Sequence, residues 1–218
     1  MLLLATRSAG KLRELRPLFA ASGIDIVDLA EAGVPESPAE DGLEVRATFE
    51  ANALAKAEYF FARTGRPTVA DDSGLCVAAL GGRPGVRSKR WSGRTDLAGL
   101  ALDDENNRLL LALLVGVADR RAHYVCAAAY VDGERAFTCR GEVRGTILRA
   151  AHGAGGFGYD PYFAADELDG RTFGEAAAGE KELVSHRGRA FRALLAELSR
   201  ALGAQGAQSG AVDPRSGR

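Results

Sequence analysis

The sequence has no excess of charge of either sign and no long apolar run. Its 218 residues carry 28 basic and 29 acidic side chains, which give a formal net charge of -1. A protein that binds a long polyanion needs surplus positive charge, so nucleic acid is not expected as a partner. No stretch reaches the roughly eighteen apolar residues of a membrane span. The opening residues, MLLLATRSAGK, lack the basic region of a signal peptide.

Cysteine is also scarce. The three residues, Cys76, Cys126 and Cys139, are far apart, lie in apolar stretches and form no CxxC pair. They are expected to be buried thiols rather than zinc or redox ligands. These absences predict a reduced, soluble and cytoplasmic protein that does not contact a membrane. A hydrophobic content of 46% is enough for one large domain or two closely packed lobes.

The patterns that are present predict an α/β protein with a mixed sheet flanked by helices. A short apolar strand at residues 2–5 precedes a polar turn and a helix that ends near Gly23. Residues 47–63 form a strong amphipathic pattern with Thr48 as a suitable N-cap. Helices and strands therefore alternate along the first part of the chain.

The second half of the chain contains a hairpin signal. Two runs of alternating apolar and polar residues meet at Asp132-Gly133, a dipeptide that favours a tight antiparallel turn. Residues 1–203 are assigned to one domain on these patterns. Residues 204–218 lack apolar periodicity and are expected to form a disordered tail.

The turn ATRSAGK, at residues 5–11, is a candidate phosphate site because it lies between a strand and a helix. Unpaired N–H groups at a helix N-terminus attract anions, Thr6 and Ser8 add hydroxyls, and Arg7 and Lys11 add positive charge. The turn does not match GxxxxGK[ST], so it is no P-loop. The alternative is a capped helix with two solvated bases.

Two adjacent acids, Asp71 and Asp72, follow the apolar end of a predicted strand. Neighbouring carboxylates repel each other unless a cation neutralises them, and hard oxygen ligands suit magnesium. Alternation along a strand sends the two side chains to opposite faces, so we expect one to face the site and the other to orient its neighbours. The alternative is a polar cap on the turn after a strand.

Three further segments carry candidate residues. Glu36, Glu40, Asp41 and Glu44 form an acidic cluster that offers another metal ligand, or is simply a solvated loop. The stretch FGYDP, Phe157 to Pro161, suits a flat ligand or a hairpin that closes a sheet. Lys181, His186 and Arg187 bring three different donors to the start of a helix, with Ser185 as its N-cap.

The order of these segments is more specific than any one of them. ATRSAGKLREL, TFEANALAKA, ADDSGLCVAALGGRPGV, GGFGYDPYF and EKELVSHRG occur in that order between Leu2 and Leu202. In this they resemble the non-standard purine nucleoside triphosphate pyrophosphatases, the family of inosine triphosphatase and bacterial dITP/XTP pyrophosphatase. The resemblance implies magnesium-dependent hydrolysis of ITP, dITP or XTP to the monophosphate and pyrophosphate. It also implies a long, curved mixed sheet in two lobes around a nucleotide cleft, and a homodimer.

The resemblance further implies a role for single residues. Asp72 matches the catalytic acid, as proton acceptor and magnesium ligand, and Glu40 is expected as the second metal ligand, with Glu44 as its competitor. The remaining matches are substrate contacts, to the triphosphate or to the base: Thr6, Arg7, Ser8, Lys11, Ser73, Phe157, Gly158, Tyr159, Asp160, Lys181, His186 and Arg187.

Two departures from the family pattern bear on these assignments. The family usually reads T-G-N-x-x-K at the first turn, whereas this chain has Arg7 and Ser8 in place of Gly and Asn. LEVRA, between Gly42 and Thr48, is longer than the usual spacing. The first change leaves a hydroxyl for phosphate, and the second makes Glu44 an alternative to Glu40.

Three rival functions are considered. A pyrophosphatase for modified pyrimidines or dTTP, as in Maf-like proteins, fits poorly with the SHRG and FGYD segments. A silent nucleotide sensor would have no need to retain Asp71, Asp72 and Lys11 together. A tRNA- or ribosome-associated protein is disfavoured by the near-zero net charge.

Overall fold

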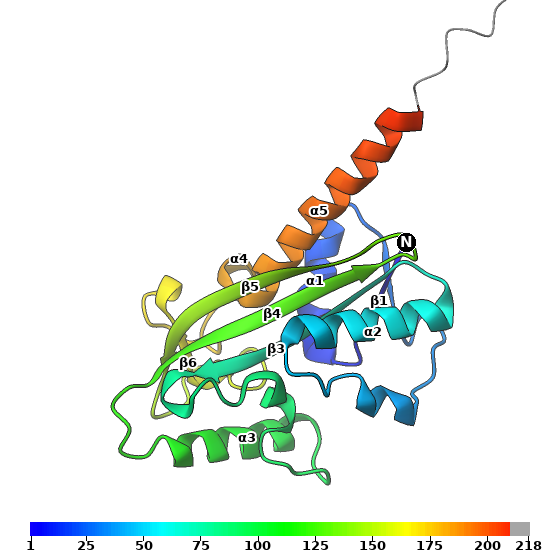
Figure 1. Cartoon of the computed structure of the whole chain (residues 1–218). Helices are drawn as coiled ribbons and strands as arrows, with labels where there is room; N and C mark the ends of the chain where they lie inside the picture. Colours follow the sequence, from blue (N-terminus) through cyan, green and yellow to red (C-terminus); the bar gives the residue numbers. More distant parts are fainter. Residues whose placement is uncertain (210–218) are drawn as a thin grey trace, which may run out of the picture.

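The computed structural model describes the backbone of residues 1–209 and the side chains of residues 1–201. Six strands form one open sheet in the order β2-β1-β3-β4-β5-β6 (Figure 1). Their bounds are β1 Leu2–Leu4, β2 Ile26–Asp28, β3 Thr68–Val77, β4 Arg121–Val131, β5 Ala136–Ile147 and β6 Phe163–Ala165. β1 is parallel to β2 and β3, and the remaining pairs are antiparallel. The predicted mixed sheet is confirmed.

Helices cover both faces of this sheet. They are α1 Ala9–Ala21, α2 Phe49–Thr64, α3 Gly99–Leu113, α4 Ala178–Val184 and α5 His186–Ser209. α2 packs on one face, where its Ala53, Ala57 and Phe60 meet small residues of β3 and β4. α1 and α5 pack on the other face, through Phe19 and Phe191 among others. Both faces of the central strands are therefore buried.

A third apolar cluster forms the second lobe. It joins the far ends of β3, β4 and β5 to α3 and β6, through Leu75, Leu110, Tyr124, Val143 and Phe163 among others. Figure 1 shows α3 below β3, apart from α2 and α1. The long strands β3 and β4 run through both lobes and hold them together.

Several local predictions are confirmed. Thr48 caps α2 by accepting a hydrogen bond from Ala51 N at 3.2 Å. β4 and β5 form the predicted hairpin, in which Asp132 N donates to Arg135 O. Ser185 accepts from Gly188 N at 3.0 Å and caps the start of α5.

Residues 85–90 form a 3-10 helix in which Ser88 is buried. One local prediction differs from the structure. α5 continues to Ser209, past Ala204, where the sequence predicts a tail; residues 210–218 lie outside the described residues. The cysteines are free thiols, of which Cys126 is buried and the other two are half-buried.

The acid pair does not sit where a strand ends. β1 stops at Leu4, which pairs with Val69, whereas β3 continues through Asp71 and Asp72 to Val77 with only β4 beside it. The chain after β1 turns away into α1, so the parallel partner of β3 is missing alongside the acids. This leaves a notch within the sheet, open toward the first turn of α1.

Among the described residues, no helix has the length and apolar character needed to cross a bilayer.

We expect Gly141→Ala to destabilise the protein. A Cβ at this position of β5 would lie 2.2 Å from His186 O and 2.5 Å from Ala190 N, so the start of α5 would have to move off the sheet. Overpacking against rigid backbone typically costs about 1–3 kcal/mol. Thermal unfolding should show a lower Tm, whereas Gly179→Ala in α4, with open space around its Cβ, should not lower it. Equal Tm values for Gly141→Ala and wild type would contradict the packing described.

Candidate active site

A cavity of about 730 Å³ lies between the two lobes, a volume in the usual range for small-molecule sites. Its walls come from the β1–α1 turn, the middle of β3, the segment between β2 and α2, α3, and the start of α5. Every residue that the sequence predicts as a site residue lines this one cavity: Thr6, Arg7, Ser8, Lys11, Glu40, Asp72, Ser73, Phe157, Gly158, Tyr159, Asp160, Lys181, His186 and Arg187. Glu44 lines it as well.

The β1–α1 turn is shaped by its own hydroxyls. Ser8 is the N-cap of α1 and accepts from Lys11 N at 3.4 Å, while Thr6 Oγ1 accepts from Ser8 N at 3.2 Å. The Lys11 ammonium turns inward and lies 3.0 Å from Asp71 Oδ2. Lys11 is therefore not a solvated base, and the partial positive charge of the helix end adds to its own.

Arg7, unlike Lys11, does not point toward Asp71. Its guanidinium forms an ion pair with Glu40 at 2.9 Å and also donates to the main-chain oxygens of Val34 and Pro35. Glu40 in turn accepts from Ser37 N in a capping box. The sequence predicts Arg7 on phosphate and Glu40 on metal. In the structure these two side chains bind each other instead. The segment that carries Glu40 lies against the β1–α1 turn, within reach of the long Arg7 side chain.

Asp71 is fully enclosed and faces α1 and α5. Lys11 and Arg187 both approach its Oδ2, Arg187 Nε at 3.4 Å. Burial alone would raise the pKa of this carboxyl, but the two cations hold it well below its usual range. The main-chain oxygen of Asp71 accepts from Lys56 Nζ at 2.8 Å. Asp71 is thus a charged anchor for the cations around the notch.

Asp72 faces the opposite side of the sheet, as alternation predicts. Asn52 Nδ2 of α2 donates to its Oδ2 at 2.8 Å, and Ser73 N donates to its Oδ1. Burial raises the pKa of Asp72 to about 6; the charge of Glu44 adds to this, while Lys11 and Lys56 oppose it. A carboxyl with this pKa can accept a proton near neutral pH.

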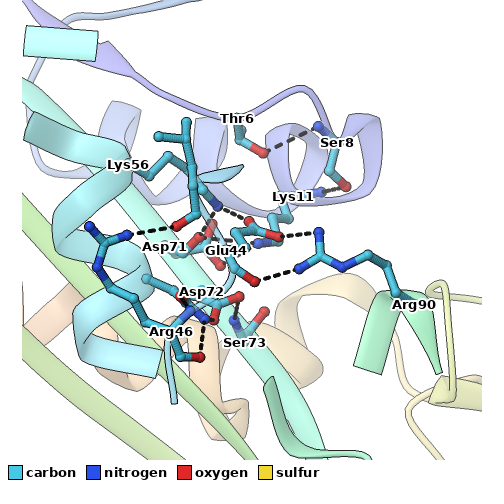
Figure 2. Close-up of polar contacts among 12 residues, drawn as sticks. Thr6, Ser8, Lys11, Glu44, Arg46, Lys56, Asp71, Asp72, Ser73 and Arg90 are labelled. Atoms are coloured by element: carbon cyan, nitrogen blue, oxygen red, sulfur yellow. Dashed lines mark hydrogen bonds and ion pairs between the residues drawn. The ribbon is translucent and has the colours of Figure 1, made fainter. Parts of the chain in front are cut away.

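Glu44 stands at the mouth of the same notch, between two cations from different lobes. Figure 2 shows Lys56 of α2 and Arg90 of the second lobe both reaching Glu44. Arg90 also donates to the Glu44 main-chain oxygen at 2.6 Å. Burial would raise the pKa of the Glu44 carboxyl, but Lys56 and Lys11 lower it to about 2. Glu44 is therefore ionised throughout the neutral range.

The two carboxylates Asp72 and Glu44 fit a magnesium ion better than Glu40 does. Both are oxygen donors on the cavity wall, and their mutual repulsion raises the pKa of Asp72, which an added cation would relieve. No group of three or more His, Cys, Asp or Glu side chains among the described residues is arranged to hold a metal. Magnesium needs no such group, since it commonly takes one or two carboxylates and fills its shell with water and phosphate oxygens.

Aromatic side chains and a buried ion pair form the other end of the cavity. The Phe157 ring packs on Gly10, where a Cβ would come within 2.6 Å of it, and the Lys181 ammonium lies 5.2 Å from the ring centre. Asp160 is buried and binds both Phe157 N at 2.8 Å and Lys181 at 2.6 Å. Tyr159 donates to Ser88 O. FGYDP is therefore an ordered turn that places the Phe157 ring on the wall of the cavity.

His186 offers an unused ring nitrogen at this end. Its imidazole stacks on Tyr124, with 4.5 Å between ring centres and 6° between planes, and its Nδ1 has no hydrogen-bond partner. Burial, together with the nearby Arg187 and Lys181, keeps the pKa of His186 well below its usual value, so the ring is neutral. A buried polar atom without a partner suits a ligand that supplies one.

Arg187 connects the two ends of the cavity. It donates to Ser73 Oγ at 2.7 Å and pairs with Glu14 of α1, which also binds Lys181. Four site residues escaped the sequence prediction: Glu14, Asn52, Lys56 and Arg90. For Asn52 and Lys56 a signal exists, since they are polar residues four apart on the buried face of α2.

Comparison with known proteins gives one consistent result. The sequence pattern of the Ham1 family matches residues 2–197. A dITP/XTP pyrophosphatase of Mycolicibacterium paratuberculosis is 47% identical over 207 residues, covering 94% of this chain and 98% of that protein. The solved structure of a HAM1 protein from Coxiella burnetii has a TM-score of 0.77 at 35% identity, covering 91% of this chain and 98% of that one. A dITP/XTP pyrophosphatase structure from Mycobacterium abscessus has a TM-score of 0.67 at 42% identity, covering 90% and 98%.

The raised pKa of Asp72 predicts an unusual dependence of stability on pH. Because the pKa of this carboxyl is about 6 in the folded protein against 3.8 ordinarily, its protonation stabilises the fold. That contribution is complete below about pH 4 and is lost as pH rises through about 6. In EDTA, Asp72→Asn should therefore gain stability over wild type as pH rises from about 4 to 6 and keep this gain at higher pH, by up to about 3 kcal/mol.

Chemical unfolding at several pH values measures this difference. Asp25→Asn, a change at an exposed position, is the control and should follow the wild-type profile. A difference between Asp72→Asn and wild type that does not change with pH would contradict the assignment.

Proposed function

The chain belongs to the Ham1 family, and we propose that it hydrolyses non-standard purine nucleoside triphosphates, namely ITP, dITP and XTP, to the monophosphate and pyrophosphate. One observation carries the proposal. Lys11, Asp72, Phe157 and Arg187 are remote in sequence yet line one cavity, with acids and cations at one end and rings with an imidazole at the other. Relatives named dITP/XTP pyrophosphatase, matched over nearly their whole length, support the same reaction.

The triphosphate would occupy the end near the β1–α1 turn. Lys11, Lys56 and Arg90 are paired with Asp71 or Glu44 in the protein alone. The phosphate oxygens would attract these cations away from Asp71 and Glu44, because a triphosphate carries more negative charge than one carboxylate. The N-terminus of α1 adds N–H donors. Thr6 and Ser8 bring hydroxyls to the same turn.

Magnesium would be held by Asp72 and Glu44. When bound, it would neutralise phosphate charge and lower the pKa of a bound water. Glu44 is kept ionised by Lys56, so it is ready to bind a cation. We assign it in place of Glu40 because the charge of Glu44 acts on Asp72 and raises the pKa of that carboxyl, whereas Glu40 pairs with Arg7.

Asp72 would act on the water that attacks the α-phosphorus. Its carboxylate can accept the proton of that water, and the hydrogen bond from Asn52 fixes its orientation. The bond from the α-phosphorus to the bridging oxygen breaks, and pyrophosphate leaves. Lys11 and the other cations of the turn would stabilise the charge that grows on the leaving group.

Base selection would depend on the six-position. Hypoxanthine and xanthine carry a carbonyl oxygen there, which accepts from donors such as Arg187 and His186, whereas the amino group of adenine does not accept. A buried donor left unpaired costs about 1–3 kcal/mol. Two such donors, at about 2–6 kcal/mol together, would separate ITP from ATP by about thirtyfold or more. Phe157 and Tyr159 would bracket the flat base.

We also propose that the protein works as a homodimer on free nucleotides in the cytoplasm, as the family resemblance implies. Light scattering at micromolar concentration tests the dimer directly.

Pyrophosphate release from ITP, dITP, XTP, ATP, GTP and dUTP, with and without Mg²⁺, tests the proposed reaction. Fast release from the first three only, and only with Mg²⁺, is expected. Asp72→Asn should lower kcat by about a thousandfold, since general-base catalysis contributes on that order. Equal turnover of the whole panel, or near-normal turnover by Asp72→Asn, would refute the proposal; preference for dTTP would favour the pyrimidine enzymes instead.

The role of Arg187 in base selection is tested by a ratio. Arg187→Ala should reduce the preference for ITP over ATP, measured as kcat/KM, by about tenfold because one selective donor is lost. This ratio does not depend on how much of the variant is folded, which matters because the change also leaves Asp71 and Glu14 with one cation fewer. An unchanged ratio would remove Arg187 from base recognition.

A further inference from the structure

We propose that Arg7 is a positioning residue that ties the segment from Val34 to Glu44 to the β1–α1 turn, and so fixes Glu44 for metal binding. The proposal rests on the function proposed above, in which Glu44 is a magnesium ligand. It gives Arg7 a different role from direct contact with phosphate, which the sequence pattern alone predicts for it.

All the hydrogen bonds of the Arg7 guanidinium to residues beyond its own turn go to this segment, while the group also lies 5.9 Å from the ring centre of Phe60 in α2. Its Nε and Nη2 donate to the two oxygens of Glu40, at 3.2 and 2.9 Å, in a bidentate pair. Nη1 donates to Val34 O at 2.9 Å and Nη2 also donates to Pro35 O at 3.0 Å. The side chains of Arg7 and Glu40 are only 26% and 18% exposed, so this pair is screened less than a surface ion pair. A planar fork with several fixed donors suits such a task.

Between Val34, which is buried in the core, and Leu43, the segment has little else to hold it in place. Its only regular structure is the short 3-10 helix Pro38–Gly42, which buries none of its residues. Backbone that buries little apolar surface opens locally at low cost in free energy. Leu43 packs partly against the core, but the turn before it is exposed. The bonds from Arg7 are therefore a main restraint on this part of the chain.

Glu44 follows this turn after Leu43, and the backbone of Arg46 beyond it is bound to Asn52, but the Glu44 side chain itself is held by cations that the substrate needs. Lys56 and Arg90 both bind it in the protein alone. When phosphate oxygens draw these cations away, the restraint through Leu43 and the Arg7–Glu40 pair remains. The charge of Arg7 is neutralised by Glu40, so it adds little attraction for the triphosphate. Loss of Arg7 should therefore change the Mg²⁺ concentration that the reaction needs, rather than the affinity for the triphosphate.

Arg7→Ala, Arg7→Lys and Glu40→Gln test this, with Arg16→Ala as the matched control. Arg16 also ties α1 to a neighbouring loop by ion pairs, but to Asp28 and Glu31 instead. Hydrogen exchange of residues 36–46 is measured on the whole protein without nucleotide. Exchange there should be faster in Arg7→Ala and Glu40→Gln, less so in Arg7→Lys, and unchanged in Arg16→Ala.

The second readout is the metal requirement. For Arg7→Ala the Mg²⁺ concentration that gives half the maximal rate should rise about tenfold, the low end of losses seen when groups that orient metal ligands are removed. At saturating Mg²⁺, kcat should stay within about twofold of wild type. Binding of Mn²⁺ to the protein without nucleotide, followed by the loss of its free EPR signal, should weaken to a similar extent.

Two results would overturn the proposal. One is unchanged exchange of residues 36–46 and unchanged Mn²⁺ binding in Arg7→Ala. The other is unchanged exchange with a higher KM for ITP at saturating Mg²⁺, which would make Arg7 a phosphate contact. The exchange and Mn²⁺ measurements involve no turnover. They therefore test Arg7 even if the wild-type protein hydrolyses none of the nucleotides, a result that would defeat the proposed function instead.

Discussion

The ionised carboxylate of Asp71, buried between Lys11 and Arg187, is the interaction on which the rest of the site depends. It joins the turn after β1, the middle of β3 and the start of α5, three pieces from different parts of the chain. A buried charge that loses its partner is costly, by several kcal/mol in other proteins, so the three groups must stay together once the fold forms. Asp71 keeps the cations in place on one face of β3, and this leaves its neighbour Asp72 free for chemistry on the other.

The elements around the site were readable from the sequence because each depends on local rules. Apolar spacing and a threonine cap predict α2, and a turn dipeptide predicts the β4–β5 hairpin. Strand alternation correctly sends Asp71 and Asp72 to opposite faces. It does not show that β3 continues past them, because that depends on where β1 stops, and β1 stops where α1 needs room to begin.

The ion-pair partners of the charged residues could not be predicted from local sequence rules. Arg7 and Glu40 are 33 positions apart and meet only because an irregular segment folds back over the turn. No periodicity governs such a segment, so Glu40 and Glu44 could not be told apart from spacing. Glu14 could not be predicted as a site residue for another reason. A glutamate on an exposed face of α1 would give the same sequence pattern, and only the position of α5 shows that Glu14 binds Lys181 and Arg187.

The early end of β1 has a consequence for how this site tolerates change. Since no strand pairs with β3 on its β1 side at the acids, the main-chain oxygen of Asp71 is open there and accepts from Lys56 at 2.8 Å and from Lys11 at 3.4 Å. Every amino acid has this oxygen. Lys11 and Lys56 therefore keep one attachment point that does not depend on a side chain, whereas Arg187 is held at this position by the Asp71 carboxylate alone.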